Sequence, residues 1–590
     1  METTAAQAVA FTLNGSPVVV EDDDSSLLDA LREQLHCRSV KDGCSPQGQC
    51  GCCTVWVDGA ARVACVTALR RVAGRSVTTV DGLAPDLRDR WVEAFVAAGA
   101  SQCGFCTPGI LLRLTALEQG RRPATREAVE SALLAHLCRC TGWQSIVEAA
   151  CVALGIADAP APAPGPGAPG GIGDPLLAAW RAQLEGPMFQ SSGAEVVLGG
   201  GGFADDTAPV GAQIRLGAAD TPLAPDLASA RRGSGKVQGR NSTVPLTHPV
   251  ALPEGEWALT LRTTWVEPAY LEPDASWARP GAPPATPLAN GGAFGGKRRS
   301  PVPGQARDLA SAAGDAVRVL WSREDVVRHG PKRPPLALGL RPNGSGLLRV
   351  GRTPGSPDLS PLIERVHEVA PGVVVEEVEV MGPPVGPELR GAGWAEVVAA
   401  LASLPALVPA LVSASASDPE LAPAGPGVGQ AEVALPNGSR AAVSVHAGGR
   451  GSVTVEVWAG ELLHEVTLRS YVLGAVHQAL GLVWSEGIAV DDEGAPLDLT
   501  IRSFGILSAR EMPEVHVVLH PDDRWPVNGS DAVFAATLAA AWIADGRPGL
   551  WPTRRGGVRH QSSQAPPPVA PSSGTATATS PPSAEEQPEP

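Results

Sequence analysis

Four cysteines between residues 103 and 140 have the type and spacing needed to bind an iron–sulfur cluster. Two residues separate Cys103 from Cys106, and one residue separates Cys138 from Cys140. Four thiolates in two close pairs are what a [2Fe–2S] cluster requires. Four cysteines also suit a structural zinc ion, but zinc sites usually have about two to four residues inside each pair. The tight second pair therefore favours iron and sulfur over zinc.

Two helices are expected to bring these pairs together. Thr107 and Pro108 are typical of a helix start, with Thr as the N-cap and Pro as the first helical residue. A second helix is predicted over roughly residues 126–136, directly before the second pair. His136 is interpreted as a surface residue of that helix rather than a ligand.

A second group of cysteines follows a predicted hairpin and helix. Residues 8–13 and 17–20 are predicted strands around Asn14-Gly15, a strong hairpin signal. The loop after the helix holds the expected ligands, which are Cys44, Cys50, Cys53 and Cys65. Plant-type ferredoxins have the spacing C-x4-C-x2-C, so this loop carries one extra residue after its first cysteine. The order of hairpin, helix and cysteine loop is that of a plant-type ferredoxin β-grasp.

The remaining cysteines are interpreted as structural. Cys37 lies too far out to replace Cys44, and Cys52 is an extra thiol inside the loop. Because free cysteine often behaves as a small apolar residue, Cys37, Cys52 and Cys151 are expected to pack in the core. A loop that contains Pro46 and Gly48 could bulge to absorb the inserted residue.

The motifs Gln-Cys-Gly-Phe-Cys-Thr-Pro-Gly and Cys-Arg-Cys-Thr-Gly-Trp closely resemble the helical iron–sulfur domain of the molybdenum hydroxylases. That family includes xanthine dehydrogenase, aldehyde oxidase and carbon monoxide dehydrogenase. The resemblance covers roughly residues 5–155 and implies two [2Fe–2S] clusters that pass electrons between a molybdenum centre and a flavin. It implies that the helical-domain cluster lies nearer the molybdopterin, and that Gln102 and Cys140 occupy positions that approach the pterin.

Composition limits the class of protein. A net charge of −16 argues against a nucleic-acid partner. All 11 cysteines lie within the first 151 residues, which indicates metal binding in a reducing compartment, and we expect a cytoplasmic protein. The N-terminus lacks the features of a signal peptide. The apolar run at residues 397–412 is interrupted by Pro405 and Pro409, so it is interpreted as a short buried helix pair and no membrane association is expected.

The predicted fold class is α+β and multidomain. Residues 1–83 are expected to form a β-grasp [2Fe–2S] domain, and residues 84–156 a four-helix [2Fe–2S]-binding domain. Residues 157–173 are rich in Pro, Ala and Gly and indicate a linker. Residues 174–555 are expected to form a degenerate α+β region similar to a molybdopterin-binding subunit, and residues 556–590 a disordered tail.

The resemblance of residues 174–555 rests on scattered motifs. Residues 290–298 resemble the GGxFGGK loop of the family's molybdenum-cofactor subunit, which implies that Phe294 and Gly295 sit against the metal centre. The same stretch nearly fits a P-loop, but Arg298 replaces the required hydroxyl residue. Residues 389–393 resemble the loop whose arginine, here Arg390, faces the substrate.

The same region departs from the family at its most important position. It is about half the length of an intact cofactor subunit, and residues 271–291 lack the expected glutamine-containing loop. Where the family has a catalytic Glu, this chain has Ser530, which is not basic at neutral pH without an activating partner. Asp531 is a carboxylate but lies one residue further along, so it is expected to point elsewhere. Apart from Arg390 and Asp531, the sequence offers no catalytic candidate.

The sequence predicts an electron-transfer subunit that works with a molybdopterin-binding large subunit and an FAD-binding medium subunit. Two alternatives stay open. The chain could be a self-contained hydroxylase with its own molybdenum, or its C-terminal half could be a non-catalytic assembly or docking surface. The substrate is open, with purines, aldehydes and carbon monoxide all compatible with the motifs.

Overall fold

The computed structural model describes most of the chain up to residue 555. The described ranges are 7–120, 123–157, 174–186, 190–218, 221–234, 245–286, 291–404, 427–448 and 450–555. The predicted linker, apart from residue 157, and the predicted tail at 556–590 lie outside these ranges.

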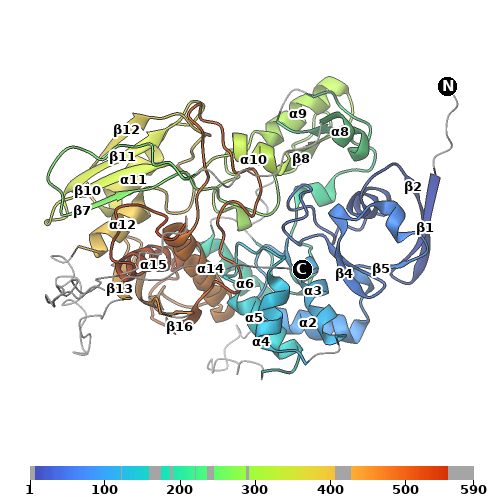
Figure 1. Ribbon diagram of the computed structural model, residues 1–590, viewed down its shortest axis with the longest axis horizontal. Helices are drawn as coiled ribbons and strands as arrows, with labels where there is room; N and C mark the ends of the chain where they lie inside the picture. Colours follow the sequence, from blue (N-terminus) through green and yellow to red (C-terminus); the bar gives the residue numbers. More distant parts are fainter. Residues whose placement is uncertain are drawn as a thin grey trace, which may run out of the picture. The chain divides into compact units, whose positions relative to one another are not determined.

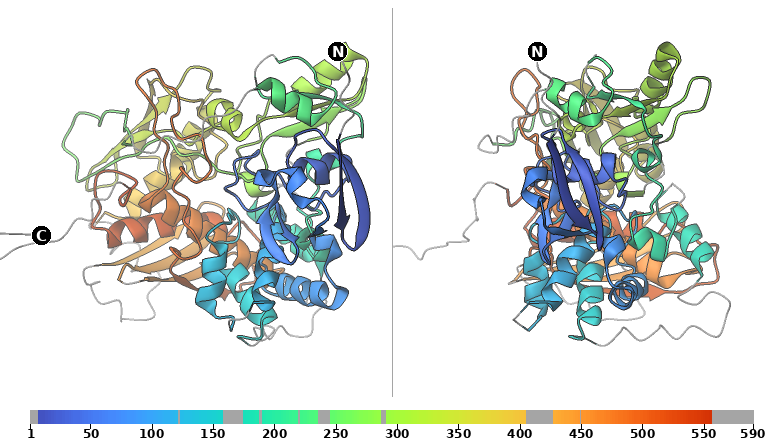
Figure 2. Two further views of the ribbon diagram at one scale, coloured as in Figure 1. Left: turned by 45° about the vertical axis from the view of Figure 1, so that its right-hand side comes forward. Right: turned by 90° about the vertical axis from the view of Figure 1, so that its right-hand side faces the viewer.

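A five-stranded mixed sheet forms the first part of the fold, with strand order β2-β1-β5-β3-β4. Its strands are β1 (Gln7–Leu13), β2 (Ser16–Asp22), β3 (Thr54–Val57), β4 (Ala60–Val63) and β5 (Ser76–Thr78). The hairpin β1–β2 confirms the prediction, since Asn14 and Gly15 both have the positive φ that this tight turn requires. Figure 2 shows these blue strands side by side. A short helix, α1 (Leu27–Asp29), continues as a π-helical turn over Ala30–Gln34 and leads into the cysteine loop.

Four helices follow the sheet: α2 (Pro85–Ala97), α3 (Thr107–Glu118), α4 (Arg126–Leu133) and α5 (Gln144–Ala153). Helix α3 begins one residue earlier than predicted, because Cys106 is its N-cap and Thr107 its first residue. Helix α4 ends three residues before the predicted end, and the side chain of Thr125 caps its start. The second cysteine pair therefore lies in the turn between α4 and α5 (Figure 1).

Three further sheets lie among the described residues of the C-terminal part. The first has the order β6-β9-β8, and the second β12-β11-β10-β7. Their strands are β6 (Gln213–Leu216), β7 (Leu259–Arg262), β8 (Ala275–Ala278), β9 (Val317–Leu320), β10 (Leu336–Leu340), β11 (Gly346–Arg352) and β12 (Val373–Glu379). The third sheet contains β13 (Val428–Ala434), β14 (Arg440–His446), β15 (Ser452–Trp458) and β16 (Glu514–His520), in that order.

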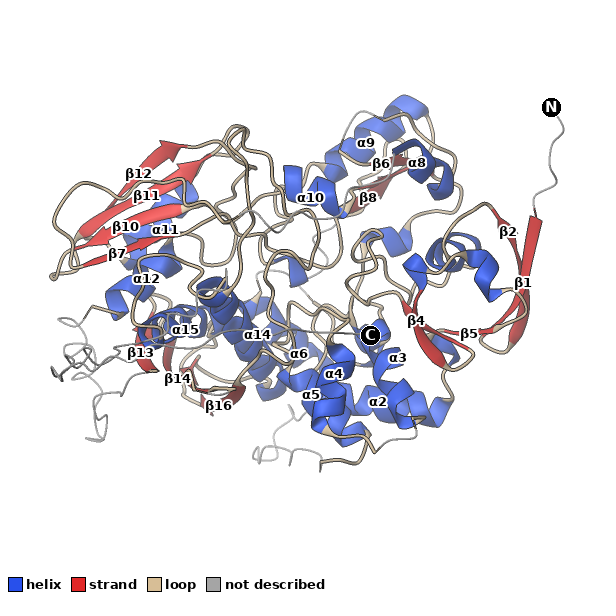
Figure 3. Cartoon of the chain, in the orientation of Figure 1, coloured by secondary structure: helices blue, strands red, loops and turns tan. Residues whose placement is uncertain are grey.

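Helices cover these sheets, as the secondary-structure colouring in Figure 3 shows. Helices α11 (Ser360–Val369) and α12 (Trp394–Ala402) pack on the second sheet, and α14 (Glu465–Trp484) and α15 (Ser530–Ala544) pack on the third. The remaining helices are α6 (Pro175–Glu185), α7 (Ala194–Val197), α8 (Leu227–Ser234), α9 (Val302–Ala313) and α10 (Arg323–His329). The region is thus mixed α/β, as expected.

The larger of two hydrophobic core clusters among the described residues runs from Val9 in the first sheet to Trp551, and the smaller one lies around α9 and β9. Residues up to 555 accordingly form one compact unit. The apolar helix α12 is largely buried in the larger cluster, whereas residues 405–412 of the predicted helix pair lie outside the described ranges. Among the described helices, none combines the length and apolar character needed to cross a membrane.

Candidate metal centres

The four expected thiols of the first loop come together in the structure. All four cysteines are buried. Hydrogen bonding to the sulfurs of Cys50 and Cys65 lowers the pKa of the Cys44 thiol. The same hydrogen bond between Cys44 and Cys65 raises the pKa of Cys65 well above its ordinary value. The sulfur of Cys53 hydrogen-bonds Cys65 in turn. The sulfurs of Cys44, Cys50, Cys53 and Cys65 are therefore neighbours, as the cluster prediction requires.

The backbone of the loop explains how the inserted residue is accommodated. Ser45 has φ +52° and Gly48 has φ +72°, so the chain turns twice in the left-handed region between the first two cysteines. The amide of Gln47 then donates to the sulfur of Cys44 at 3.1 Å. The bulge at Ser45 and Gly48 keeps Cys44 beside the other thiols despite the extra residue.

Cys52 is buried next to this group of four thiols. Its sulfur hydrogen-bonds that of Cys50, and a Cβ built on Gly43 would lie 3.0 Å from the sulfur of Cys50 and 3.1 Å from that of Cys52. Cys52 is 1% exposed, which agrees with a packing position. Its interpretation as a non-ligand stays a prediction.

The helical-domain thiols also form two sulfur contacts, and each contact joins one segment to the other. The sulfurs of Cys103 and Cys140 are 3.7 Å apart. A hydrogen bond between Cys106 and Cys138 raises the pKa of Cys106 and lowers that of Cys138 to about 6. The start of α3 and the turn after α4 thus present their thiols to one point.

The donor set fits a binuclear cluster. In a [2Fe–2S] cluster four thiolates are shared between two irons. Two buried sets of four thiols, each made of sulfur contacts between separate segments, suit that cluster better than a lone zinc ion.

The two thiol sets adjoin each other through the backbone. The amide of Leu137 donates to the carbonyl of Cys50 at 3.0 Å. Because Leu137 directly precedes Cys138, this hydrogen bond and Leu137 are all that separates Cys50 of the first site from Cys138 of the second along this path. His136 fills the space beside this contact. Its interpretation as a surface residue was wrong: it is 2% exposed, its Nε2 lies 3.1 Å from Thr54 Oγ1, and burial lowers its pKa to about 3.

The C-terminal part binds the turn that carries Cys138 and Cys140 through an ion pair and a hydrogen bond. The Arg139 guanidinium forms a two-pronged ion pair with the Glu486 carboxylate, and both side chains are buried. Arg139 Nε also donates to the carbonyl of Pro268 at 3.2 Å. A residue 347 positions away in the chain therefore holds the second cysteine pair in place, and no local motif could have identified it.

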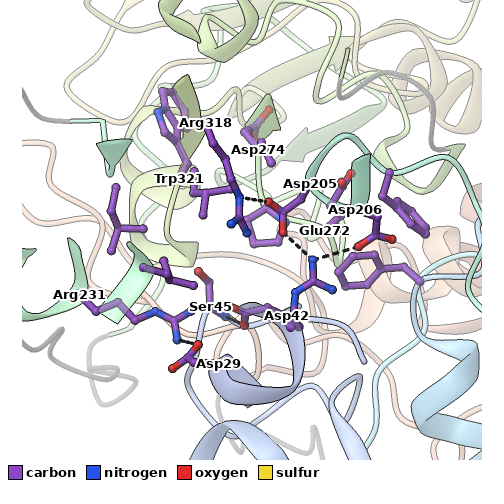
Figure 4. Close-up of a pocket in the computed structure, with 18 residues that line it drawn as sticks. Asp29, Asp42, Ser45, Asp205, Asp206, Arg231, Glu272, Asp274, Arg318 and Trp321 are labelled. Atoms are coloured by element: carbon purple, nitrogen blue, oxygen red, sulfur yellow. Dashed lines mark hydrogen bonds and ion pairs between the residues drawn. The ribbon is translucent and has the colours of Figure 1, made fainter. Parts of the chain in front are cut away.

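An ion-pair network fastens the first domain to the C-terminal part (Figure 4). Asp205 accepts from Arg32 at 2.7 Å and from Arg318 at 2.6 Å, and Arg231 pairs with Asp42 at 2.7 Å. Burial opposes ionisation of Asp205, but the guanidinium groups of Arg318 and Arg32 hold its pKa well below the usual range. These charges stay paired at neutral pH and join the cysteine loop of the first domain to the second half of the chain.

The predicted cofactor and substrate residues of the C-terminal part share one cavity. A cavity of about 350 Å³ is lined by Phe294, Gly295, Arg390 and Asp531. Its volume lies in the range of small-molecule sites. Asp531 was expected to point elsewhere, but it lines this cavity and pairs with Arg390 at 3.0 Å. Gln102 instead bridges the interface, since its amide donates to the carbonyl of Cys140 at 2.9 Å and to Ser470 at 3.1 Å.

A carboxylate that the sequence did not point to, Glu185, lies beside Ser530 at the expected catalytic position. Ser530 Oγ accepts from Arg390 at 2.6 Å and is fully buried. Glu185, at the end of α6, accepts from the Ser530 amide at 2.8 Å and from the Gly529 amide at 3.1 Å, and it also lines the cavity. Sequence reasoning missed Glu185, because it lies outside every recognisable motif and meets α15 only in the folded chain.

Comparisons with known proteins agree with this geometry. Residues 11–70 match the family described as 2Fe-2S iron-sulfur cluster binding domain, and residues 79–151 match the [2Fe-2S] binding domain. The nicotine 6-hydroxylase small subunit of Paenarthrobacter nicotinovorans is 43% identical over 131 residues, which are 22% of this chain and 79% of that protein. The iron-sulfur-binding subunit of xanthine dehydrogenase from Escherichia coli is 37% identical over 142 residues, which are 24% of this chain and 89% of that protein.

The chain as a whole is similar in fold to solved structures. Aldehyde oxidoreductase from Desulfovibrio gigas superposes with a TM-score of 0.64 over 92% of this chain and 99% of that chain, at 16% sequence identity. The corresponding enzyme of Desulfovibrio desulfuricans gives a TM-score of 0.63 over 93% of this chain and 99% of that chain, also at 16% identity. At that identity the likeness concerns the fold alone.

Two matched iron–sulfur domains joined to this fold define an iron–sulfur oxidoreductase. The chain belongs to the molybdenum hydroxylase family, and its N-terminal part is the family's [2Fe–2S] subunit with two cluster-binding domains.

Proposed function

We propose that the chain relays electrons between a molybdopterin centre and a flavin through two [2Fe–2S] clusters. The observation that carries the proposal is the pairing of two complete thiol sets across one backbone hydrogen bond, from Leu137 to Cys50. Cys44, Cys50, Cys53 and Cys65 hold the first cluster, and Cys103, Cys106, Cys138 and Cys140 hold the second. Each cluster, when bound, accepts and donates single electrons.

The surroundings of the two sites suit different ends of such a relay. Cys65 is followed directly by Val66, which is 62% exposed, so the chain reaches the surface beside one thiol of the first site. The C-terminal part holds the second site through the pair Arg139–Glu486. As the family resemblance places the helical-domain cluster nearer the molybdopterin, electrons enter at that cluster and leave at the first, where an FAD-binding subunit docks.

The residues around the sulfurs orient and tune the clusters. Backbone amides that donate to cluster sulfurs favour the reduced, more negative state. The amide of Gln47 does this for Cys44 and the amide of Cys65 for Cys53, at 3.1 and 3.4 Å. Thr141 lies 3.2 Å from the sulfur of Cys138 and adds a side-chain partner in the second site.

Metal analysis and EPR test this proposal. Purified full-length chain should contain about four irons, and the reduced protein should give two distinct [2Fe–2S] signals. One signal only, or zinc in place of iron, would contradict the assignment.

A second candidate function is a fused hydroxylase that carries its own molybdopterin. It is favoured by the cavity, where Phe294, Gly295 and Arg390 meet as the family resemblance implies, together with Asp531. The chemistry of this lining suits a polar ligand, but the groups near the catalytic position already have partners: Arg390 binds Ser530 and Asp531, and Glu185 accepts from the amides of Gly529 and Ser530. A general base needs a free group of suitable pKa within reach of the proton it removes.

The molybdenum content of the isolated chain separates the two candidates. We expect little molybdenum and no turnover of xanthine or aldehydes by the single chain, with turnover restored when intact molybdenum and flavin subunits are added. Stoichiometric molybdenum with turnover would establish the fused enzyme instead. In that case Asp531→Ala and Glu185→Gln would identify which carboxylate serves as the base.

A further inference from the structure

Gly292 lies directly against the second thiol set. It belongs to the short turn Gly291–Ala293, inside the stretch that resembles the family's cofactor loop. A Cβ built on Gly292 would lie 3.2 Å from the sulfur of Cys103 and 3.2 Å from the sulfur of Cys140. Only a residue without a side chain fits at this distance without displacing a sulfur.

Two other segments of the C-terminal part approach the same site as closely. A Cβ on Gly201 would lie 2.3 Å from the carbonyl of Cys103, and a Cβ on Gly474 would lie 1.9 Å from the carbonyl of Cys140. The backbone at residue 292 therefore faces the sulfurs of Cys103 and Cys140, and the backbone at residues 201 and 474 packs against the carbonyls of these two cysteines. None of the three segments belongs to the helical domain itself.

We propose that Gly292 is a positioning residue of the second cluster, and that the C-terminal half of the chain forms the wall that sets the reduction potential of that cluster. The inference rests on the proposed electron relay. Cluster potentials depend on burial and on the dipoles and hydrogen bonds around the sulfurs. A wall of backbone in contact with Cys103 and Cys140 excludes water from these sulfurs and fixes the dipoles that face them.

The first cluster provides a matched comparison. Gly43, in its own domain, stands in the same relation to Cys50, since its Cβ would lie 3.0 Å from that sulfur. Neither Gly43 nor Gly292 has a positive φ, so alanine is compatible with both backbones and its effect comes from the contact alone. Gly304, in α9, has open space around it and also lacks a positive φ.

The experiment compares Gly292→Ala, Gly43→Ala and Gly304→Ala in the full-length chain by EPR and redox titration. Gly292→Ala should change the signal and midpoint potential of the helical-domain cluster only. Gly43→Ala should change those of the first cluster, with a smaller effect on the second, because its Cβ would also lie 3.2 Å from the ring of Phe105. A change on the order of tenfold in the ratio of oxidised to reduced cluster corresponds to a shift of about 59 mV for one electron. Gly304→Ala should leave both clusters unchanged.

The outcomes separate this inference from the proposed function. If the unsubstituted chain lacks two [2Fe–2S] signals, the relay itself is wrong. If both signals are present and Gly292→Ala matches Gly304→Ala, the relay stands and the wall is refuted. Selective loss of the helical-domain signal in a folded Gly292→Ala protein supports the wall. If that variant misfolds, the unsubstituted chain decides: a helical-domain EPR signal that a soluble paramagnetic ion relaxes as strongly as it relaxes a solvent-exposed cluster refutes the wall, and a signal shielded from the ion supports it.

Discussion

The buried ion pair between Arg139 and Glu486 allows the link between the two halves of the chain to be tested by one substitution. In Glu486→Gln the side chain keeps its shape but loses its charge. The Arg139 guanidinium, which is 6% exposed, then stays buried without a counter-charge. Because Arg139 lies between Cys138 and Cys140, its displacement should disturb the second cluster before the first.

The expected loss of stability follows from the burial of the pair. Removing one partner of a buried ion pair costs about 3–5 kcal/mol, because an uncompensated charge is left inside the protein. The Arg139 side chain retains its bond to the Pro268 carbonyl, so we expect the lower end of that range, about 3 kcal/mol. The exposed pair Arg349–Glu376 is the matched control, and Glu376→Gln should cost about 0–1 kcal/mol.

Urea titration followed by EPR measures the effect. The EPR signal of the helical-domain cluster should disappear at lower urea in Glu486→Gln than in the unsubstituted protein, while Glu376→Gln should not move it. The double variant Arg139→Met, Glu486→Leu should recover most of the loss, since an apolar pair of similar volume replaces a buried ion pair at little cost. If Glu486→Gln leaves the urea dependence of that signal unchanged, the ion pair does not hold the cysteine turn and the argument fails.

Three further predictions follow from the same sites. Cys44→Ser should abolish one EPR signal while Cys52→Ala keeps both, and the reverse pattern would show that the inserted residue has shifted the ligand set. Residues 1–156 expressed alone should bind about four irons, because every cysteine lies there; loss of one cluster from the fragment would place the domain boundary elsewhere. Burial, aided by the nearby Arg139, lowers the pKa of His477 to about 3. Between about pH 6.5 and pH 3 the unfolded chain binds a proton at this histidine and the folded chain does not, so the free energy of unfolding falls as the pH drops. The slope is up to about 1.4 kcal/mol per pH unit. His477→Gln should therefore flatten the acid limb of a plot of stability against pH, and an unaltered slope would contradict the sign.

The iron–sulfur part could be predicted from sequence because its signals are local. The hairpin at Asn14-Gly15 needs only the two residues of its turn, and it folds as predicted. Cysteine spacing likewise reports directly on a ligand set, since ligands must converge on one cluster. The errors are small where they occur: α3 begins one residue early because Cys106 takes the cap position that Thr107 was expected to fill.

The residues that sequence reasoning missed act over long range. Glu486 and Glu185 each meet their partners only after the chain has folded, across 347 and 345 residues respectively. His136 was misplaced for a related reason: α4 alone does not reveal that the loop at Gly51 packs on the imidazole, where a Cβ would lie 2.4 Å from its Cδ2. Such contacts leave no periodicity or motif in the sequence.

The C-terminal half contacts the parts of the chain that carry both sets of cysteines. It supplies the ion pair to Arg139, the backbone at Gly292 and the network around Asp205, so it contacts both cysteine loops at once. A region without any function would not need to pack closely against both sites. Gly292 does not have a positive φ, so its backbone would accept a larger residue if nothing lay against it. Under the proposed relay these contacts enclose the helical-domain cluster, and none of them involves Ser530, so the enclosure and the catalytic position can be tested by separate substitutions.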